Sequence, residues 1–288
     1  MLIRKMSELG LDYEKNARQK TQKHLQKTVR RELLPNGSYA PVAGIFDIGW
    51  EGWKDLPSAD FVKSLRELDN DITKENEMWI MGLAPMIERG ELDMQQLREW
   101  ALNYYYHVDT FAIEIVEHVF HNLNDREVRD VILRHVAEEV GHGELMADFL
   151  EHGFGMDRIR DVQGSKPKDR DMRSILTLQT PELAALLKMS PPLAYATIPF
   201  FERHLPKQNN MLARGLRKHY GFASNVLGWF DLHSYVDIYH ERFGLYVIGK
   251  YATSKKEQEL LQAAVESNRR ALIASSQEAY KSVGVRGI

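Results

Sequence analysis

The chain has 288 residues, of which 43% are hydrophobic and 27% are charged, and its formal net charge is −3 at pH 7. These values are ordinary for a globular protein and lack the basic excess that binds polyanions, so nucleic acid and anionic membranes are not expected as partners. The absence of cysteine excludes disulfides, thiolate catalysis, iron–sulfur clusters and cysteine-ligated zinc, so any bound metal must take nitrogen and oxygen ligands.

The amino-terminal part of the chain is polar and mixed in charge. Residues 12–34 predict a basic, solvated helix, and Pro35-Asn36-Gly37 predicts a turn. The apolar residues that follow, to about residue 53, allow a short strand or an irregular segment. Neither a signal peptide nor an apolar run of about 18 residues is present, so we expect a cytoplasmic protein without a membrane partner.

The rest of the chain shows helical periodicity and helix-capping signals. Ser58 or Asp60 can begin a helix that continues to about residue 88, and Glu91-Leu92-Asp93 begins another that ends near Leu123. We therefore expect an all-α protein, with an N-terminal helical extension over residues 1–75 and a helical domain over residues 76–288.

The helix expected to end near Leu123 carries several possible metal ligands. Glu114, His118 and His121 follow at i, i+4 and i+7, and His107 lies one heptad before Glu114. Such spacing places the side chains on one helical face. This face is therefore unusually rich in side chains of the types that bind metals.

The next helix contains Glu139-x-x-His142, and its apolar positions repeat at helical spacing. A glutamate and a histidine at i and i+3 share one face of a helix, which is how di-iron helical bundles present such a pair. The motif is weak alone, because any Glu-rich helix produces it by chance. Glu138 stays open as the alternative to Glu139.

Further helices are predicted to start near Pro181 and at Pro191-Pro192. The second of them brings Glu202 directly after a run of apolar and aromatic residues. A surface glutamate paired with Arg203 or His204 is the commoner interpretation of such a residue. Glu202 is a candidate metal ligand because other helices also offer ligand residues.

The most specific pattern is His233, Asp237 and His240, at i, i+4 and i+7. On one helix these side chains fall within an arc of about 60°. Two imidazoles and a carboxylate suit iron, manganese or zinc better than calcium. The alternative is a buried histidine at 233 beside a surface pair of Asp237 and His240.

Taken in order, these motifs resemble the heme-oxygenase-like di-iron oxidases and oxygenases, relatives of the TenA and PqqC folds. The resemblance runs from about Leu97 to about Tyr280. The fatty-acid decarboxylase that makes terminal alkenes is similar in its Glu-x-x-His spacing, whereas other members carry a glutamate seven residues before the histidine. In this sequence that position is His135, which departs from the pattern.

The resemblance implies a compact heme-oxygenase-like bundle of about seven helices that holds two Fe²⁺ per chain and uses O2 as co-substrate, although manganese stays open. It implies Glu139, Glu202 and Asp237 as the catalytic carboxylates. The implied metal ligands are Glu139, His142, Glu202, His233, Asp237 and His240, with Glu114 as an additional carboxylate.

The implied activity is oxidation of a small carboxylate- or amine-bearing metabolite by decarboxylation, C–C cleavage or N-oxygenation, in specialised biosynthesis. Arg203 or Arg242 could orient a substrate carboxylate, and a homodimer and an external electron donor are further expected partners. Two alternatives stay open. One is a cofactor-less TenA- or PqqC-like enzyme, and the other is a helical metal-binding protein without turnover.

Overall fold

The computed structural model describes residues 52–163 and 180–282, and these residues contain helices and turns but no strand. The expectation of an all-α fold is therefore confirmed. The helix and strand predictions for residues 12–51 lie outside the described residues. The helices are Ala59–Glu75 (α2), Glu77–Ile80 (α3), Ala84–Arg89 (α4), Met94–His121 (α5), Arg126–Glu139 (α6), His142–Asp148 (α7), Pro181–Met189 (α8), Pro191–Glu202 (α9), Leu205–Tyr220 (α10), Gly228–His233 (α11), Asp237–Tyr251 (α12) and Lys255–Ser282 (α13), with short helical turns at Gly52–Asp55 (η1), Phe149–Gly153 (η2), Arg158–Gln163 (η3) and Ser224–Val226 (η5).

Several helix ends follow directly from local sequence. Asp93 caps α5 by accepting hydrogen bonds from the backbone N–H groups of Gln95 and Gln96, and the Gln96 side chain accepts from the Asp93 N–H. This reciprocal pair is a capping box, which satisfies backbone donors that lack partners at a helix start. The single helix expected over residues 58–88 instead forms α2, α3 and α4, with Gly82 at a positive φ of 53° in the last turn between them.

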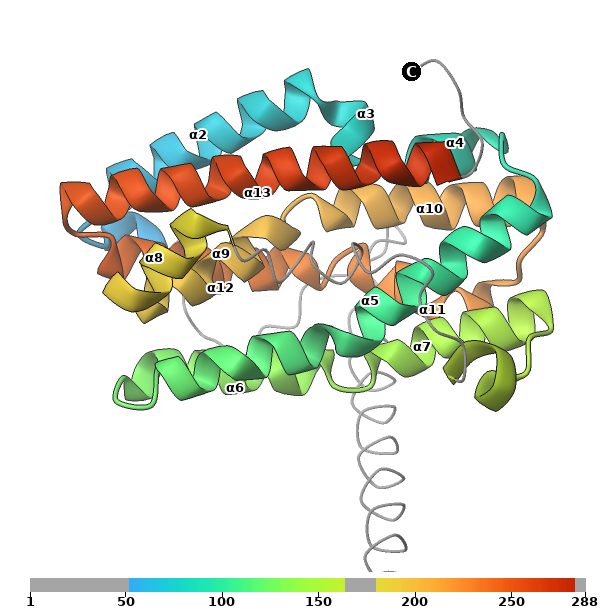
Figure 1. Cartoon of the computed structure of the whole chain (residues 1–288), viewed down its shortest axis with the longest axis horizontal. Coiled ribbons are helices and arrows are strands. Elements are labelled where there is room, and N and C mark those ends of the chain that lie inside the picture. Colours follow the sequence, from blue (N-terminus) through green and yellow to red (C-terminus); the bar gives the residue numbers. More distant parts are fainter. Residues whose placement is uncertain (1–51, 164–179, 283–288) are drawn as a thin grey trace, which may run out of the picture. The chain divides into compact units, whose positions relative to one another are not determined.

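The centre of the bundle is formed by α9 and α12, which pack closely against each other. Figure 1 shows them between α13 and α10 on one side and α6 and α7 on the other. A Cβ atom at Gly244 in α12 would lie 2.8 Å from the backbone nitrogen of Phe200 in α9. Only glycine permits this approach of the two backbones, which brings the candidate ligands of both helices together.

A buried cluster of charges connects α2 to the later helices. Arg269 of α13 is 1% exposed and donates to both carboxylate oxygens of Asp69, at 2.5 and 3.0 Å. Arg203, just after α9, donates to Asp69 Oδ2 at 2.7 Å. Paired charges of this kind avoid the large cost of an isolated buried ion. They hold α2 against the helices that carry the candidate site.

The described residues, 52–163 and 180–282, belong to one compact unit. The predicted boundary at residue 75 falls at the end of α2, which packs against α12 and α13 within that unit. None of the described helices combines the length and apolar character that a membrane crossing requires.

Candidate metal centre

The structure brings together the main candidate ligands that the sequence predicts, from helices far apart in the chain. Each of them is at most 4% exposed. Together with His135, they form three overlapping buried groups that could each hold a metal ion: Glu139, His142 and His233; Glu139, Asp237 and His240; and His135, Glu202 and His240.

The ligand-bearing helices are interrupted at the site, contrary to the continuous helices expected from sequence. Glu139 is the last residue of α6 and His142 the first of α7. Gly141 between them adopts a left-handed φ of 95°, which is costly for any residue with a Cβ atom. Glu139 and His142 therefore converge across a turn rather than along one helix face.

The same holds for the other two ligand segments. His233 ends α11 and Asp237 begins α12, so the helical arc expected for His233, Asp237 and His240 is broken by a turn. Glu202 ends α9, and Pro206 follows four residues later. The ring of a proline clashes with the carbonyl of residue i−4, so α9 cannot continue through residue 206.

Glu139 lies at the centre of the cluster and faces three histidines. Its Oε2 is 2.8 Å from His142 Nδ1 and 3.9 Å from His233 Nε2, and its Oε1 is 3.3 Å from His240 Nδ1. His240 Nδ1 also lies 2.8 Å from Glu202 Oε2 and 3.4 Å from Asp237 Oδ1. A carboxylate placed in this way can serve two neighbouring metal positions.

The outward-facing ring nitrogens are held by other groups. His233 Nδ1–H donates to the Trp229 carbonyl at 3.0 Å, and its ring stacks on the Trp229 indole. His240 Nε2–H donates to Glu138 Oε2 at 3.1 Å. Partners of this kind fix the tautomer and orientation of metal-binding histidines. The geometry distinguishes the roles of the two neighbouring glutamates. Glu139 faces into the cluster, whereas Glu138 accepts a hydrogen bond from His240 on the outer side.

Electrostatics within the cluster oppose the effect of burial at Glu139 and His240 but not at Asp237. Burial raises the pKa of Glu139, but His142, His233 and His240 outweigh it and hold that pKa well below its ordinary value. Burial lowers the pKa of His240, but Glu202, Asp237 and Glu138 raise it well above its ordinary value. For Asp237, burial dominates and raises the pKa. Negative oxygens and imidazoles thus face one another in a water-poor space.

Many of these polar atoms make no hydrogen bond of ordinary geometry. They are His135 Nε2, Glu139 Oε1, Glu202 Oε1 and Oε2, His233 Nε2, Asp237 Oδ2 and His240 Nδ1. Buried polar atoms are nearly always hydrogen-bonded, so a group of exceptions requires an explanation. Their convergence fits divalent iron, which carboxylate and imidazole ligands bind well.

His135 is a member of the cluster that the sequence-based ligand set did not include. It is fully buried on α6, and its Nε2 lies 3.4 Å from Glu202 Oε1. The signal available in the sequence was its spacing: His135 precedes Glu139 by four residues and therefore shares its helix face.

The predicted ligand stripe of α5 stays outside the buried groups. Glu114 belongs to none of them, and His121 is exposed. Burial and the nearby His121 lower the pKa of His118 to about 4, so His118 is neutral near pH 7. A separate surface group, Asp148, Glu151 and His152, is explained by Arg158, which forms ion pairs with both of its carboxylates.

We expect His118→Ala, His121→Ala and Glu114→Ala to keep the metal content of the wild type, because none of the three residues belongs to a buried group. Metal per chain after anaerobic loading with Fe²⁺, measured by mass spectrometry, tests this. Loss of a metal in Glu114→Ala would instead assign that carboxylate to the centre, and loss in His121→Ala would assign a ligand role to a histidine that is given none here.

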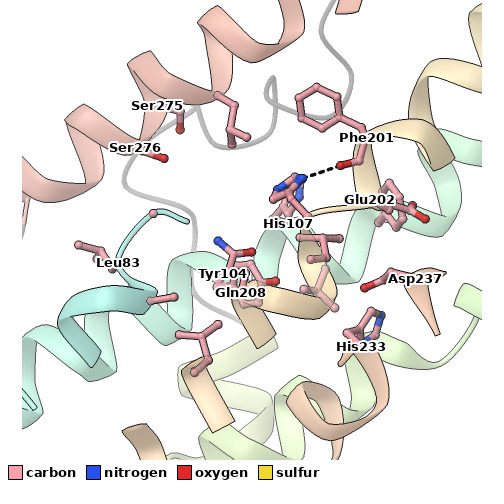
Figure 2. Close-up of a pocket in the computed structure, with 18 of the residues that line it drawn as sticks. Leu83, Tyr104, His107, Phe201, Glu202, Gln208, His233, Asp237, Ser275 and Ser276 are labelled. Carbon is pink, nitrogen blue, oxygen red and sulfur yellow. Dashed lines mark hydrogen bonds between the residues drawn. The ribbon is translucent and has the colours of Figure 1, made fainter. Parts of the chain in front are cut away.

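A cavity of about 140 Å³ adjoins the cluster. Figure 2 shows Glu202, Asp237 and His233 on one side of it, and Leu83, Ser275 and Ser276 on the other. The lining is mostly apolar and aromatic, and within residues 52–163 and 180–282 no lysine or arginine contributes to it. Arg203 and Arg242 therefore do not contact the cavity; Arg203 binds Asp69, and Arg242 lies over the ring of Tyr239.

Comparison with known proteins agrees with this site. A family model described as "iron-containing redox enzyme" matches residues 98–275, the segment that contains every member of the buried groups. The chain belongs to this family. It is thus an oxidoreductase in general terms, and the iron named by the family agrees with the ligand types of the cluster. A search of curated proteins found no significant match.

Solved structures similar to this redox enzyme share its fold at low sequence identity. A TenA homolog from Pseudomonas syringae pv. tomato has a TM-score of 0.61 and 13% identity, covering 81% of this chain and 96% of its own. A CADD-like protein of unknown function from Nostoc punctiforme has a TM-score of 0.60 and 14% identity, and the match covers 77% of this chain and 98% of that protein's chain. A domain of unknown function with a heme oxygenase-like fold from Shewanella denitrificans has a TM-score of 0.56 and 12% identity, and the match covers 83% of this chain and 94% of that domain's chain. The expected heme-oxygenase-like fold is confirmed.

Proposed function

We propose that the protein is a non-haem di-iron oxidase or oxygenase that uses O2 to oxidise a small carboxylate- or amine-bearing metabolite. The observation that carries the proposal is the overlap of the buried groups at Glu139 and His240. Overlapping sets of carboxylates and imidazoles are how helical bundles hold two irons side by side.

The proposed ligands divide between two positions. Glu139, His142 and His233 would hold one iron. Glu202, Asp237 and His240 would hold the other, with Glu139 close enough to serve both. Bound there, the two irons would supply dioxygen with two electrons at one place. The reactions that this two-electron chemistry would allow include oxidative decarboxylation, C–C cleavage and N-oxygenation.

The chain's own residues would prepare the substrate for this chemistry. The apolar walls of the cavity exclude water, and its volume of about 140 Å³ is near that of an engineered cavity of ~150 Å³ that binds benzene. A substrate would therefore place a small apolar part against Trp100, Phe111 and Phe201. Because no lysine or arginine among the described residues lines the cavity, the bound iron would be the positive partner of a substrate carboxylate.

Tyr104 is placed to hold a proton beside the reacting end of a substrate. It lines the cavity, and burial raises the pKa of its hydroxyl above the ordinary value. The hydroxyl therefore stays protonated near pH 7. As a neutral donor it could orient a polar substrate group without adding charge to the site.

Anaerobic loading with Fe²⁺, metal counting and stopped-flow absorption on mixing with O2 test the proposal. We expect about two irons per chain, a transient visible absorption band, and faster formation or decay of that band with a productive substrate from a panel of medium-chain fatty acids, amino acids and amines. Protein treated with a chelator is the control and should consume no O2. A sample shown to carry two irons that O2 does not oxidise would contradict the oxidase function and favour a structural metal. Absence of iron binding would favour a cofactor-less, TenA-like enzyme.

A further inference from the structure

His135 occupies a position in the cluster that the proposed ligand set does not use. Its ring centroid lies 4.3 Å from that of His240, and its Nε2 is 3.4 Å from Glu202 Oε1. Ligand atoms of His135, Glu202 and His240 all lie within 4.8 Å of one another, and all three residues are buried. This distance is short enough for one ion to reach all three.

The other ring nitrogen of His135 is held from outside the cluster. Nδ1 shares a hydrogen bond of 3.2 Å with the hydroxyl of Tyr195, a fully buried residue of α9. With Nδ1 engaged by the Tyr195 hydroxyl, Nε2 is the ring nitrogen that faces Glu202 and His240.

The hydrogen bonding of His135 differs from that expected of a purely structural histidine. A buried structural histidine satisfies both ring nitrogens, because each unmet polar atom costs about 1–3 kcal/mol. Here Nδ1 is satisfied, while Nε2 has no hydrogen bond of ordinary geometry. His233 and His240 show the same division between one nitrogen held outside and one directed inward.

We propose that His135 Nε2 is a metal ligand, and that His135, His240 and Glu202 form the second metal position, beside the position of Glu139, His142 and His233. This inference rests on the proposed two-iron centre and completes its second half. Each position then offers two imidazoles and one carboxylate as its core set. Asp237, which shares a group with Glu139 and His240, adds a further carboxylate between them.

The ligand type at residue 135 has a consequence for metal choice. Imidazole suits iron, nickel, copper and zinc, whereas carboxylate and water suit manganese and magnesium. A histidine at residue 135 therefore favours Fe²⁺ over Mn²⁺ at the second position, and a carboxylate in its place would weaken that preference.

The experiment compares the full chain with His135→Ala and with the matched control His118→Ala. His118 is a half-buried histidine whose ring lies 6.1 Å from that of the same Tyr195, yet it belongs to none of the buried groups. After anaerobic loading with Fe²⁺ and removal of free metal, we expect about two irons in the wild type and in His118→Ala, and about one in His135→Ala. The absorption spectrum of protein loaded with Co²⁺ instead should lose the bands of one site in His135→Ala only.

Two further variants keep the test decisive if His135→Ala folds poorly. His135→Glu should retain two metals and raise the ratio of bound Mn²⁺ to bound Fe²⁺ when the two compete. Tyr195→Phe should weaken the second metal about 10- to 100-fold, as expected when a partner that orients a ligand is lost.

Full metal content and an unchanged Co²⁺ spectrum in His135→Ala would overturn the assignment of His135, while leaving a two-iron oxidase intact. Loss of one metal in His135→Ala, in a protein whose irons do not react with O2, would keep the assignment and overturn the oxidase. A wild type that binds one metal would overturn the two-iron centre, and the Co²⁺ spectrum of His135→Ala would then still decide whether His135 binds it.

Discussion

Replacing Glu139 with alanine should remove metal from both positions of the proposed centre. Glu139 is a member of two of the three buried groups, and its two oxygens face His142 and His240 at 2.8 and 3.3 Å. The ligands left at the first position would be two imidazoles without their carboxylate. Iron per chain after anaerobic loading, measured by mass spectrometry, should fall to a small fraction of the wild-type content, and His233→Ala should lower it sharply as well. Circular dichroism should show unchanged helix content in both variants.

The neighbouring Glu138 provides a matched control for this prediction. Its carboxylate accepts from His240 Nε2–H and lies outside the cluster. Glu138→Ala should therefore weaken metal affinity about 10- to 100-fold but keep full loading at saturating Fe²⁺. If Glu138→Ala lost its metal and Glu139→Ala kept it, Glu138 would be the metal ligand and Glu139 the residue that supports a histidine.

Replacing Asp69 with alanine should strongly destabilise the fold. The change would leave Arg269, which is 1% exposed, without its carboxylate, and Arg203 would lose the same partner. Breaking a buried ion pair from one side costs about 3–5 kcal/mol, because an uncompensated charge stays in the interior. Urea denaturation should report a decrease of that order in the free energy of unfolding. Glu77→Ala, which removes an exposed pair with Lys207, should cost at most about 1 kcal/mol.

The contribution of Asp69 should also depend on pH. Burial raises the pKa of Asp69, but Arg269, Arg203 and His204 outweigh it and lower that pKa from its ordinary value of 3.8. A group with a lowered pKa in the folded state stabilises the protein above the unfolded-state pKa and loses this contribution as pH falls. The difference in unfolding free energy between the wild type and Asp69→Asn should therefore be constant at neutral pH and shrink below about pH 4. A difference that grows on acidification would contradict the assigned sign.

Local sequence was sufficient for much of the fold and for the types of ligand. The capping box at Asp93, the proline at residue 181 and the pair at 191 and 192 mark helix starts that the structure confirms, because caps and prolines act on the backbone within one turn. The order and spacing of Glu139, His142, Glu202, His233, Asp237 and His240 were readable as a set of nitrogen and oxygen ligands. Their chemistry is a property of the side chains themselves.

Tertiary structure decided which of these side chains meet and how they are oriented. The breaks at Gly141 and between His233 and Asp237 were not expected, since a helical period predicts a continuous helix until packing makes another backbone conformation more favourable. The distinction between Glu138 and Glu139 and the inward direction of His135 depend on partners in other helices, namely His240 and Tyr195. The pairing of Asp69 with Arg269 joins residues 200 positions apart. Contacts of this range follow from how the helices pack, and a single sequence carries periodicity and chemistry but not the distances between its helices.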